Sequence, residues 1–493
     1  MQSNLTPFSK SSLRTRCILA ARGKNDLRKL DRQLAKLLEQ AATLQRRESN
    51  YRSQLEKHQN DPRSNESATK KQIEAIKNQR LGTHRDIQNN TIRLSDEVRS
   101  RLNHELGNGC FSWNLSLGPT VGRRQTYQIP NDFYTRLLAQ EVIADLRRLK
   151  GGKQLDRMST VRALKTALER VPNYSVLRLD ITKFFESIPH MKLEEKISRE
   201  SSLSATTQDL VALLLKEYRK VNTHGTKKVG VPQGVNFSSA LAEAYMHDFD
   251  TRWSEHPGVA FYCRYVDDII IIVDPDGKDA LKLAVQMEKQ IIRDLGRLGL
   301  TINKKKTDRI DVCTNNSDEQ NWQFNYLGYS YLIRNSETPP IVVKLTPERL
   351  TRIKERIRLS FKSWRRSTRK AQKNNDRQKS LDAIKSSNAL LLKRLRFLAG
   401  NTKIPSSQGT VSVGIYFSNS AITSTDQIQT LDSYLEYLLS ENSELVQSFF
   451  TSTKQRQRLD NISFIEGFES KKFQILKPGE VKEISKCWKE KVK

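Results

Sequence analysis

The chain has 493 residues, enough for about three domains of ordinary size. Its 85 Lys and Arg against 55 Asp and Glu give a formal net charge of +30, which favours a polyanion as partner, with an acidic membrane surface as the alternative. The longest strongly apolar run, Ile269–Val273, is far too short to cross a bilayer, and the opening MQSNLTPFSK lacks the apolar stretch of a signal peptide. Five scattered cysteines without a CxxC pair argue against a disulfide framework or a zinc ribbon, and predict reduced thiols in a cytosolic protein.

Leucines spaced three and four residues apart mark the first predicted element. The pattern is typical of a coiled-coil helix and comprises Leu27, Leu30, Leu34, Leu37, Ala41 and Leu44. Glu48 interrupts it, and residues 58–67 contain helix breakers. A second apolar series follows, formed by Ile73, Ile76, Ile87, Ile92 and Leu94. We expect an antiparallel helical hairpin over about 24–104, with self-association through a coiled coil or a solvated long helix as alternatives.

Short β-type runs alternate with helical stretches in the middle of the chain. The runs are Ser175–Ile181, Phe261–Val273 and Phe324–Leu332, and a glycine-bearing loop at Gly107–Gly122 precedes them. This alternation predicts an α+β or α/β catalytic body.

The composition becomes strongly basic after Pro339–Pro340. Residues 349–379 carry 13 Lys or Arg against two acids, and Leu350, Ile353, Ile357 and Phe361 form one apolar stripe. We expect an amphipathic helix whose basic face contacts a phosphate backbone, the alternative being a merely solvated face. Beyond residue 400, a β-like run at Thr410–Phe417 and a helix at Leu431–Leu445 are predicted.

Three aspartates are the candidate catalytic groups. Asp180 ends a β-type run, and Asp267 and Asp268 lie between two apolar runs, as at the tip of a β-hairpin. Adjacent carboxylates repel each other unless a cation lies between them. With Asp180 they could hold Mg²⁺, and two such ions could activate a 3′-hydroxyl and stabilise a leaving pyrophosphate. For the Asp-Asp pair alone, a plain polar turn is the alternative.

Five short blocks occur in a characteristic order. They are Asp180 with Phe185, Gly230–Gly234 (GVPQG), Tyr265–Asp268 (YVDD), Leu298–Asn303 followed by Lys304–Lys306, and Phe324–Tyr329. Each is weak alone, but in this order the chain resembles a reverse transcriptase over about residues 120–340, through the motifs lettered A to E.

The resemblance implies a right-hand polymerase architecture. It consists of fingers and a palm with an antiparallel sheet over 106–340, and a basic helical thumb over 341–400. An N-terminal helical hairpin (1–105) and a mainly helical C-terminal module (401–493) flank this body. The resemblance assigns two Mg²⁺ ions, for which Mn²⁺ can substitute. Their implied ligands are Asp180, Asp267, Asp268 and the backbone carbonyl of Ile181.

It also implies roles for the substrate-facing residues. Phe185 resembles the steric gate that excludes a 2′-hydroxyl, which implies dNTP substrates. Gln233 and Gly234 resemble contacts to the incoming nucleotide and template, and Lys306 resembles the lysine that protonates or neutralises pyrophosphate.

Further contacts to triphosphate, primer and duplex follow from the same resemblance. Arg123 and Arg124 occupy the place of triphosphate-binding cations, with Arg136 or Arg162 as alternatives. The implied primer grip consists of Tyr326, Leu327 and Gly328. The implied nucleic-acid contacts of the basic helix are Arg356, Lys362, Arg365, Arg366 and Arg369.

Weaker matches point to a group within this family. Leu241–Met246 and Arg394–Thr402 are similar to bacterial abortive-infection and defence-associated reverse transcriptases. This implies a cytoplasmic antiphage enzyme that uses an RNA template, a DNA product, dNTPs and a dedicated noncoding RNA, with no membrane. The N-terminal helices could bind a second copy or a partner protein. The alternatives are a polymerase fold that binds nucleic acid without catalysis, and an RNA-directed RNA polymerase, against which the aromatic Phe185 argues.

Overall fold

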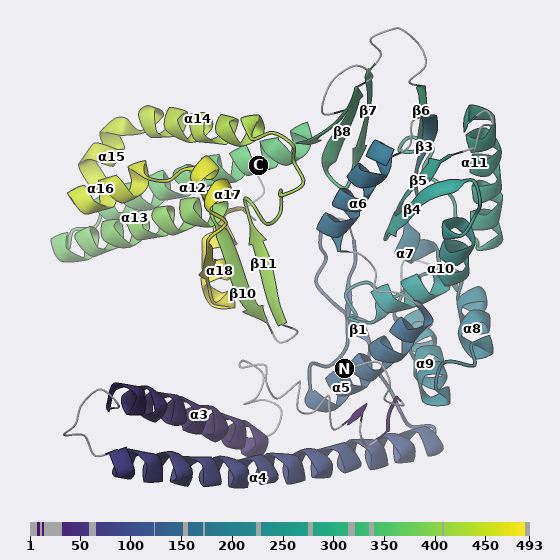
Figure 1. Ribbon diagram of the computed structural model, residues 1–493, viewed down its shortest axis with the longest axis horizontal. Helices are drawn as coiled ribbons and strands as arrows, with labels where there is room; N and C mark the ends of the chain where they lie inside the picture. Colours follow the sequence, from purple (N-terminus) through teal and green to yellow (C-terminus); the bar gives the residue numbers. More distant parts are fainter. Residues whose placement is uncertain are drawn as a thin grey trace. The chain divides into compact units, whose positions relative to one another are not determined.

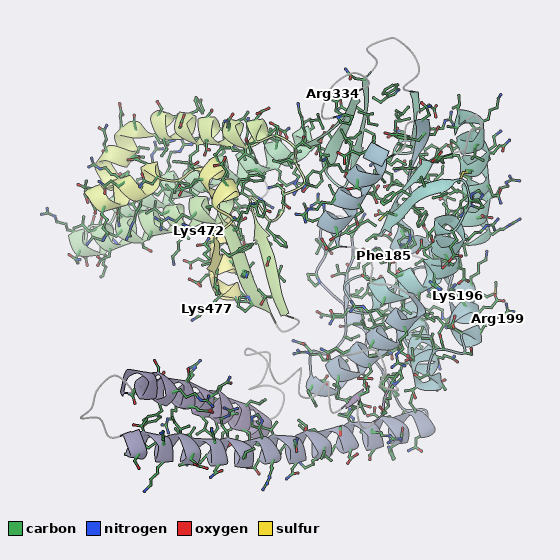
Figure 2. All side chains as sticks on the ribbon, in the orientation of Figure 1. Phe185, Lys196, Arg199, Arg334, Lys472 and Lys477 are labelled. Carbon is green, nitrogen blue, oxygen red and sulfur yellow. The ribbon has the colours of Figure 1, made fainter. Side chains whose placement is uncertain are left out.

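The computed structural model describes most of the chain, drawn as a ribbon in Figure 1 and with side chains in Figure 2. The described residues are 7–9, 12–13, 32–58, 66–122, 124–150, 156–170, 173–222, 228–274, 280–313, 321–334, 340–406 and 409–488. The chain divides into two compact units. The first comprises Met1–Lys153, Ile181–Arg252 and Ile291–Ile302, and the second comprises Gln154–Asp180, Trp253–Gln290 and Asn303–Lys493. Within the described residues, no helix combines the length and apolar composition needed to cross a membrane.

The first unit is mainly helical. Its elements are α3 (Arg32–His58), α4 (Glu66–Gly107), β1 (Ser116–Leu117), β2 (Tyr127–Gln128), α5 (Phe133–Leu146), η1 (Arg147–Lys150), α7 (Phe184–Ser187), α8 (His190–Arg199) and α9 (Ala205–Val221). Helices α10 (Ser238–Ser254) and α11 (Ala280–Arg297) each cross a boundary between the units.

Helices α3 and α4 lie side by side (Figure 1). Leu44, Ile73 and Ile76 are buried, as their apolar spacing predicts. Glu48, which interrupts the leucine pattern, is only 5% exposed. Its carboxylate pairs with Arg52 at 2.7 Å and with Arg80 of α4. A cross-helix ion pair therefore replaces an apolar contact at this position, and the expected start of the hairpin near residue 24 lies outside the described residues.

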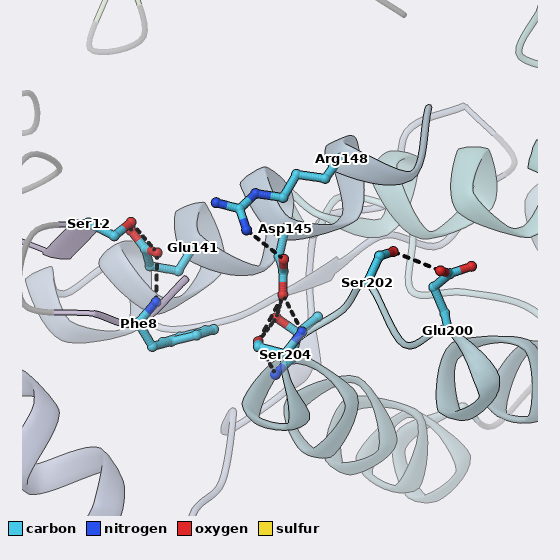
Figure 3. A network of polar contacts seen from close by, with 9 residues as sticks. Phe8, Ser12, Glu141, Asp145, Arg148, Glu200, Ser202 and Ser204 are labelled. Atoms are coloured by element: carbon cyan, nitrogen blue, oxygen red, sulfur yellow. Dashed lines mark hydrogen bonds and ion pairs between the residues drawn. The ribbon is translucent and has the colours of Figure 1, made fainter. Parts of the chain in front are cut away.

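Two fully buried carboxylates of α5 attach other segments to that helix (Figure 3). Glu141 accepts hydrogen bonds from the backbone N of Phe8 at 3.1 Å and from Ser12 Oγ at 2.7 Å. Asp145 accepts from the backbone N and Oγ of Ser204, at 3.0 and 2.8 Å. Because a buried carboxylate without partners is costly, these bonds hold the N-terminal segment and the start of α9 against α5.

The second unit contains a four-stranded antiparallel sheet with the order β4–β5–β3–β6. Its strands are β3 (Asn173–Asp180), β4 (Val259–Tyr265), β5 (Asp268–Val273) and β6 (Asp308–Cys313). In β5 the run Ile269–Val273 is completely buried, which suits a central strand covered on both faces. Ile270 and Ile272 share a core cluster with Val161 and Leu164 of α6 (Arg157–Arg170).

A second antiparallel sheet has the order β7–β8–β9. It consists of β7 (Asn321–Tyr326), β8 (Tyr329–Arg334) and β9 (Ile341–Leu345). The β-type run expected at Phe324–Leu332 is two strands, because Leu327 and Gly328 adopt positive φ angles of 49° and 72° and form a two-residue hairpin turn. The expected combination of helices and antiparallel sheets is confirmed, while the fingers, palm and thumb arrangement stays a prediction.

The basic stretch forms parts of two helices. Helix α12 (Pro347–Gln372) ends before the expected residue 379, and α13 (Arg377–Ala399) follows. Asp376 caps α13 by accepting a hydrogen bond from the backbone N of Lys379 at 3.1 Å. Asn and Asp side chains compete for backbone hydrogen bonds, which explains why the helix expected over 349–379 is interrupted here.

Residues beyond 400 pack onto α12 and α13. They form β10 (Asn401–Ser406), β11 (Gly409–Gly414), β12 (Phe473–Ile475), α14 (Asp426–Glu441), α15 (Ser443–Phe449), α16 (Thr453–Asp460), α17 (Phe464–Ser470), α18 (Pro478–Ser485) and η2 (Lys486–Trp488). The expected strand Thr410–Phe417 therefore ends at Gly414, and the expected helix Leu431–Leu445 is two helices. Leu431 and Leu435 share one core cluster with Phe361, Trp364 and Leu391. The domain boundaries at 340 and 400 stay predictions.

Candidate active site

The acidic pair lies at the end of a β-hairpin, as the sequence predicts. Strands β4 and β5 pair in register up to Tyr265 and Asp268, which leaves Val266 and Asp267 as a two-residue turn. Val266 has a φ of 61°, a conformation that β-branched residues rarely adopt. The turn thus carries backbone strain next to the two aspartates, as is common at functional sites.

Strand register brings Asp180 beside this turn. Asp180 is the last residue of β3 and pairs directly with Asp268 across the antiparallel ladder. Directly opposed residues have Cβ atoms about 4.5–5.5 Å apart, so two carboxylates at these positions repel each other. Asp180 is only 4% exposed. The sheet therefore concentrates negative charge at one edge, with Asp267 next to Asp268 in the turn.

Two cations lie against these carboxylates. Lys306 Nζ is 3.0 Å from Asp180 Oδ2. Arg178 lies 3.6 Å from Asp268 Oδ1 and 3.7 Å from Asp308 Oδ2. Burial raises the pKa of Asp268, and the attraction of Arg178 opposes that rise.

The carboxylates fit a divalent ion by the chemistry of their donors. Among the described residues, no three His, Cys, Asp or Glu side chains are arranged to hold a metal ion. However, Asp268 Oδ1 is buried and lacks a hydrogen-bond donor within the described part of the chain. Carboxylate oxygens are the ligands that Mg²⁺ prefers, so a bound ion would compete with Lys306 for Asp180. Ile181 is buried, and its carbonyl stays a predicted ligand.

The hairpin predicted as the primer grip contacts the backbone of the catalytic strand. Tyr326 Oη, fully buried, donates a hydrogen bond to the carbonyl O of Asp268 at 3.4 Å. The Leu327 carbonyl accepts from Arg157 Nε at 3.0 Å, and a Cβ at Gly328 would come within 2.8 Å of the Arg157 guanidinium. Glycine thus allows the close approach of Arg157, a residue that sequence reasoning missed because it belongs to no recognisable motif.

In the first unit, Phe185 lies beside the GVPQG loop. Phe184 is buried, whereas Phe185, labelled in Figure 2, is half-buried. The Phe185 carbonyl accepts a hydrogen bond from Val231 N at 2.8 Å. Gly230 N donates to Ile188 O at 2.7 Å. The structure therefore brings together two blocks that the sequence separates by more than forty residues.

Backbone contacts shape the loop at Gln233 and Gly234. The Gln233 carbonyl accepts from Tyr127 N at 2.6 Å. Gly234 has a φ of 98°, and a Cβ there would lie 2.7 Å from the Tyr127 carbonyl O, so only glycine fits. The Gln233 side chain is half-buried.

Of the arginines predicted to bind triphosphate, the structure describes Arg124, Arg136 and Arg162. Arg124 is exposed near β2, and Arg123 lies outside the described residues. Arg162, the alternative, donates to Ser420 Oγ at 2.6 Å within the second unit. Which of these arginines binds the triphosphate therefore stays a prediction.

His190 contacts the GVPQG loop. It was missed by sequence reasoning, because a single histidine after Ile-Pro matches no motif. It is 1% exposed, and its Nε2 lies 2.7 Å from the Gly230 carbonyl O. A carbonyl can only accept, so Nε2 carries the proton and Nδ1 is the unprotonated nitrogen. Nδ1 is buried and has no hydrogen-bond partner among the described residues.

The buried histidine predicts a pH dependence of stability. Burial lowers the pKa of His190 in the folded chain. The unfolded chain therefore binds the proton more readily, and stability falls as pH drops through the ordinary histidine pKa of about 6.5. Urea unfolding between pH 7.5 and 5.5 should show this loss in the wild type and less of it in His190→Gln. His84→Gln is the control, because His84 is exposed. An equal pH dependence in the His190→Gln and His84→Gln variants would contradict the role of His190 in this loss of stability.

Residues 124–331 match the family model described as reverse transcriptase (RNA-dependent DNA polymerase). The matched segment includes Asp180, Phe185, Gln233, Asp267 and Lys306. The matched segment, which is less than half of the chain, is thus similar to a reverse transcriptase domain. No curated protein sequence matches the chain.

Solved telomerase structures show a distant similarity. Apo telomerase from Candida tropicalis, truncated from its C-terminal domain, has 16% identity and a TM-score of 0.32, and the match covers 52% of this chain and 60% of that chain. Telomerase from Candida albicans, in complex with a fragment of telomeric RNA, has 12% identity and a TM-score of 0.29, covering 71% of this chain and 53% of that one. The chain thus spans less than two thirds of either telomerase chain.

Proposed function

We propose that the protein is an RNA-directed DNA polymerase that adds dNTPs to a 3′-hydroxyl on an RNA template. One observation carries the proposal. Asp180 and Asp268 oppose each other on paired strands, with Asp267 in the adjoining turn, inside the segment that matches the reverse transcriptase family. Such a cluster of carboxylates at one sheet edge suits divalent-ion binding.

The predicted site residues have distinct roles in the proposal. Asp180, Asp267 and Asp268 would hold two Mg²⁺ ions, and the chemistry supplied there would be activation of the attacking hydroxyl and stabilisation of the leaving pyrophosphate. Lys306 is 58% exposed while it contacts Asp180. Its ammonium is therefore accessible to a pyrophosphate, whose charge it can neutralise. Phe185 excludes the 2′-hydroxyl of a ribonucleotide.

Incorporation of labelled dNTPs by the purified chain with Mg²⁺ tests this function. The reaction is run with and without an added RNA template and DNA primer. Incorporation that requires the added template supports a conventional reverse transcriptase. Incorporation without it that RNase abolishes indicates a co-purified RNA template, and incorporation that survives RNase indicates untemplated synthesis.

Besides untemplated synthesis, two outcomes would contradict the proposal. Failure in every arm, including reactions supplied with RNA from the host of origin, would favour a protein that binds nucleic acid without catalysis. Incorporation of ribonucleotides in preference to dNTPs would identify an RNA-directed RNA polymerase.

Helix α12 offers a surface for the template–product duplex. Of the five residues predicted there, Lys362, Arg366 and Arg369 are exposed. Arg365 lies 3.7 Å from Glu441, and the Arg356 guanidinium lies 5.7 Å from the centre of the Trp488 ring. The α12 cations therefore differ in how freely they can contact phosphate.

This difference predicts how nucleic-acid affinity depends on salt. Each phosphate contact to a duplex contributes about 0.9 to the slope of log K against log salt concentration. Changing Lys362, Arg369 and Lys370, all exposed, to glutamine should therefore lower the slope by about 3. Fluorescence anisotropy with a labelled primer–template duplex, repeated over a range of salt concentrations, measures this slope. Arg365→Gln, which removes a cation already paired with Glu441, should change the slope by less than about 0.5. An unchanged slope in the triple variant would contradict a role for α12 in duplex binding.

We also propose a bacterial, cytoplasmic role in antiphage defence, with a dedicated noncoding RNA as template. Its support is the similarity of Leu241–Met246 and Arg394–Thr402 to defence-associated reverse transcriptases. Helices α3 and α4 are the proposed contact for a second copy or a partner protein. Phage plaque counts on cells with and without the gene test the role, with Asp267→Asn as the inactive control, and equal counts would contradict it.

A further inference from the structure

One face of the β11–β10–β12 sheet exposes apolar side chains next to lysines. Strand register aligns Lys403 with Ile475 and Asn401 with Phe473, and alternate residues of a strand share a face. Ile475 is 72% exposed and Phe417, which follows β11, is 41% exposed. The Phe417 ring lies 6.2 Å from the Phe473 ring, so it belongs to the same surface. We call Lys403, Phe417, Phe473 and Ile475 the aromatic–lysine face.

Positive charge surrounds these rings. Lys403 Nζ lies 5.0 Å from the centre of the Phe473 ring, and Lys471 Nζ lies 5.0 Å from that of Tyr416. Lys472 and Lys477 lie on either side of β12, beside β10 and β11 in Figure 2. In the described part of the chain, none of these four ammonium groups has a carboxylate partner. Glu480, the nearby acid, accepts instead from the backbone N of Lys477 at 3.0 Å.

Asn401 fixes the position of the exposed aromatic ring. It is 1% exposed, and its Oδ1 accepts from the backbone N of Tyr416 at 2.9 Å and of Phe417 at 3.1 Å. Its Nδ2 donates to the Gly467 carbonyl O at 2.9 Å. Its Oδ1 therefore holds the segment after β11 against the sheet, while its Nδ2 ties the sheet to α17. A ring held in this way loses little conformational entropy when a ligand stacks on it.

We propose that the aromatic–lysine face binds single-stranded RNA, with bases stacked on Phe417 and Phe473 and phosphates contacted by the lysines. Every base offers a flat apolar surface to an aromatic ring, and its phosphate offers a charge to a lysine. Protein–protein interfaces are depleted in lysine, so the four unpaired ammonium groups favour RNA over a protein partner. The choice of RNA rests on the proposed function, because the DNA product stays paired with the copied template, while the template still to be copied is single-stranded RNA.

Fluorescence anisotropy with labelled oligouridylate and the full-length protein tests the proposal. Stacking on an aromatic ring contributes about 1–3 kcal/mol per base. The double variant Phe417→Ala/Phe473→Ala should therefore raise the Kd for RNA at least about tenfold. Phe417→Leu/Phe473→Leu should have the same effect, because leucine is apolar but offers no flat ring for stacking. Double tyrosine should retain binding. Changing Lys403, Lys472 and Lys477 to glutamine should lower the salt slope by about 2. Tyr437→Ala, 60% exposed on α14, is the matched control.

A second measurement does not depend on variants folding. Ultraviolet crosslinking of oligouridylate to the wild type, followed by peptide mapping, should label the peptides that contain Phe417 or Phe473. Labelling confined to other peptides, or an unchanged Kd in the alanine and leucine variants, would overturn the proposal. Equal affinity for oligodeoxythymidylate would overturn the choice of RNA. If the alanine and leucine variants lost a co-purified protein but kept their RNA affinity, the face would be assigned to a protein partner.

The two proposals fail separately. Incorporation of dNTPs by the wild type, with RNA affinity that does not depend on the face, contradicts only this inference. RNA affinity that depends on the face, without incorporation under any condition, contradicts only the polymerase function.

Discussion

Asp267→Asn is expected to lower dNTP incorporation by about a thousandfold or more. The substitution keeps the shape of the side chain but removes one negative charge from the edge formed with Asp180 and Asp268. Stabilisation of the transition state by a bound metal is worth several kcal/mol, and about 4 kcal/mol corresponds to a thousandfold in rate. Primer extension at saturating dNTP and Mg²⁺ measures the loss.

The loss should not arise from unfolding. Asp267 raises the pKa of Asp268 through charge repulsion, so neutralising Asp267 relieves a repulsion in the folded chain. The urea midpoint of Asp267→Asn is therefore expected to equal or exceed that of the wild type. Asp311→Asn is the matched control, because Asp311 lies in the same sheet and accepts a hydrogen bond from Ser175 at 2.6 Å. Near-normal incorporation by Asp267→Asn, or an equal loss in Asp311→Asn, would contradict the catalytic assignment.

Phe185→Ala is expected to raise the relative use of ribonucleotides by roughly tenfold to a hundredfold. A half-buried ring that overlaps a 2′-hydroxyl imposes a steric penalty, and overpacking of this kind costs about 1–3 kcal/mol. Removing the ring removes that penalty for the ribonucleotide alone. Single-nucleotide incorporation gives the ratio of kcat/KM for matched ribonucleotide and deoxyribonucleotide pairs.

Phe184 provides the control for this experiment. Its ring lies 5.4 Å from that of Phe185 but is buried at 2% exposure, so its role is packing. Phe184→Leu keeps most of the apolar volume and should cost less than about 1.5 kcal/mol of stability. It should leave the preference for deoxyribonucleotides unchanged. A ratio that moves equally in both variants would show a general disturbance of α7 and would refute the gate.

The sequence could predict features that depend on residues close together in the chain, namely strands, turns and motif blocks. The apolar run Ile269–Val273 predicts a strand, and the acids before it predict the turn, because strand and turn propensities act within a few residues. The same local reasoning erred at Phe324–Leu332 and at 349–379, where Gly328 and the cap Asp376 interrupt otherwise continuous patterns. The order of the motif blocks indicated the same family whose model matches residues 124–331.

Contacts between residues far apart in the sequence could not be predicted and became visible only in the folded chain. Lys306 reaches Asp180 across 126 positions of the chain, and His190 reaches Gly230 across 40. No local pattern encodes such pairs, since they depend on strand register and on how loops pack over one another. Likewise, the lysines and rings around β10 come from segments about seventy residues apart, and they become one surface only because β12 pairs with β10. The sequence thus determined which chemical groups the chain carries, and folding determined which of them meet.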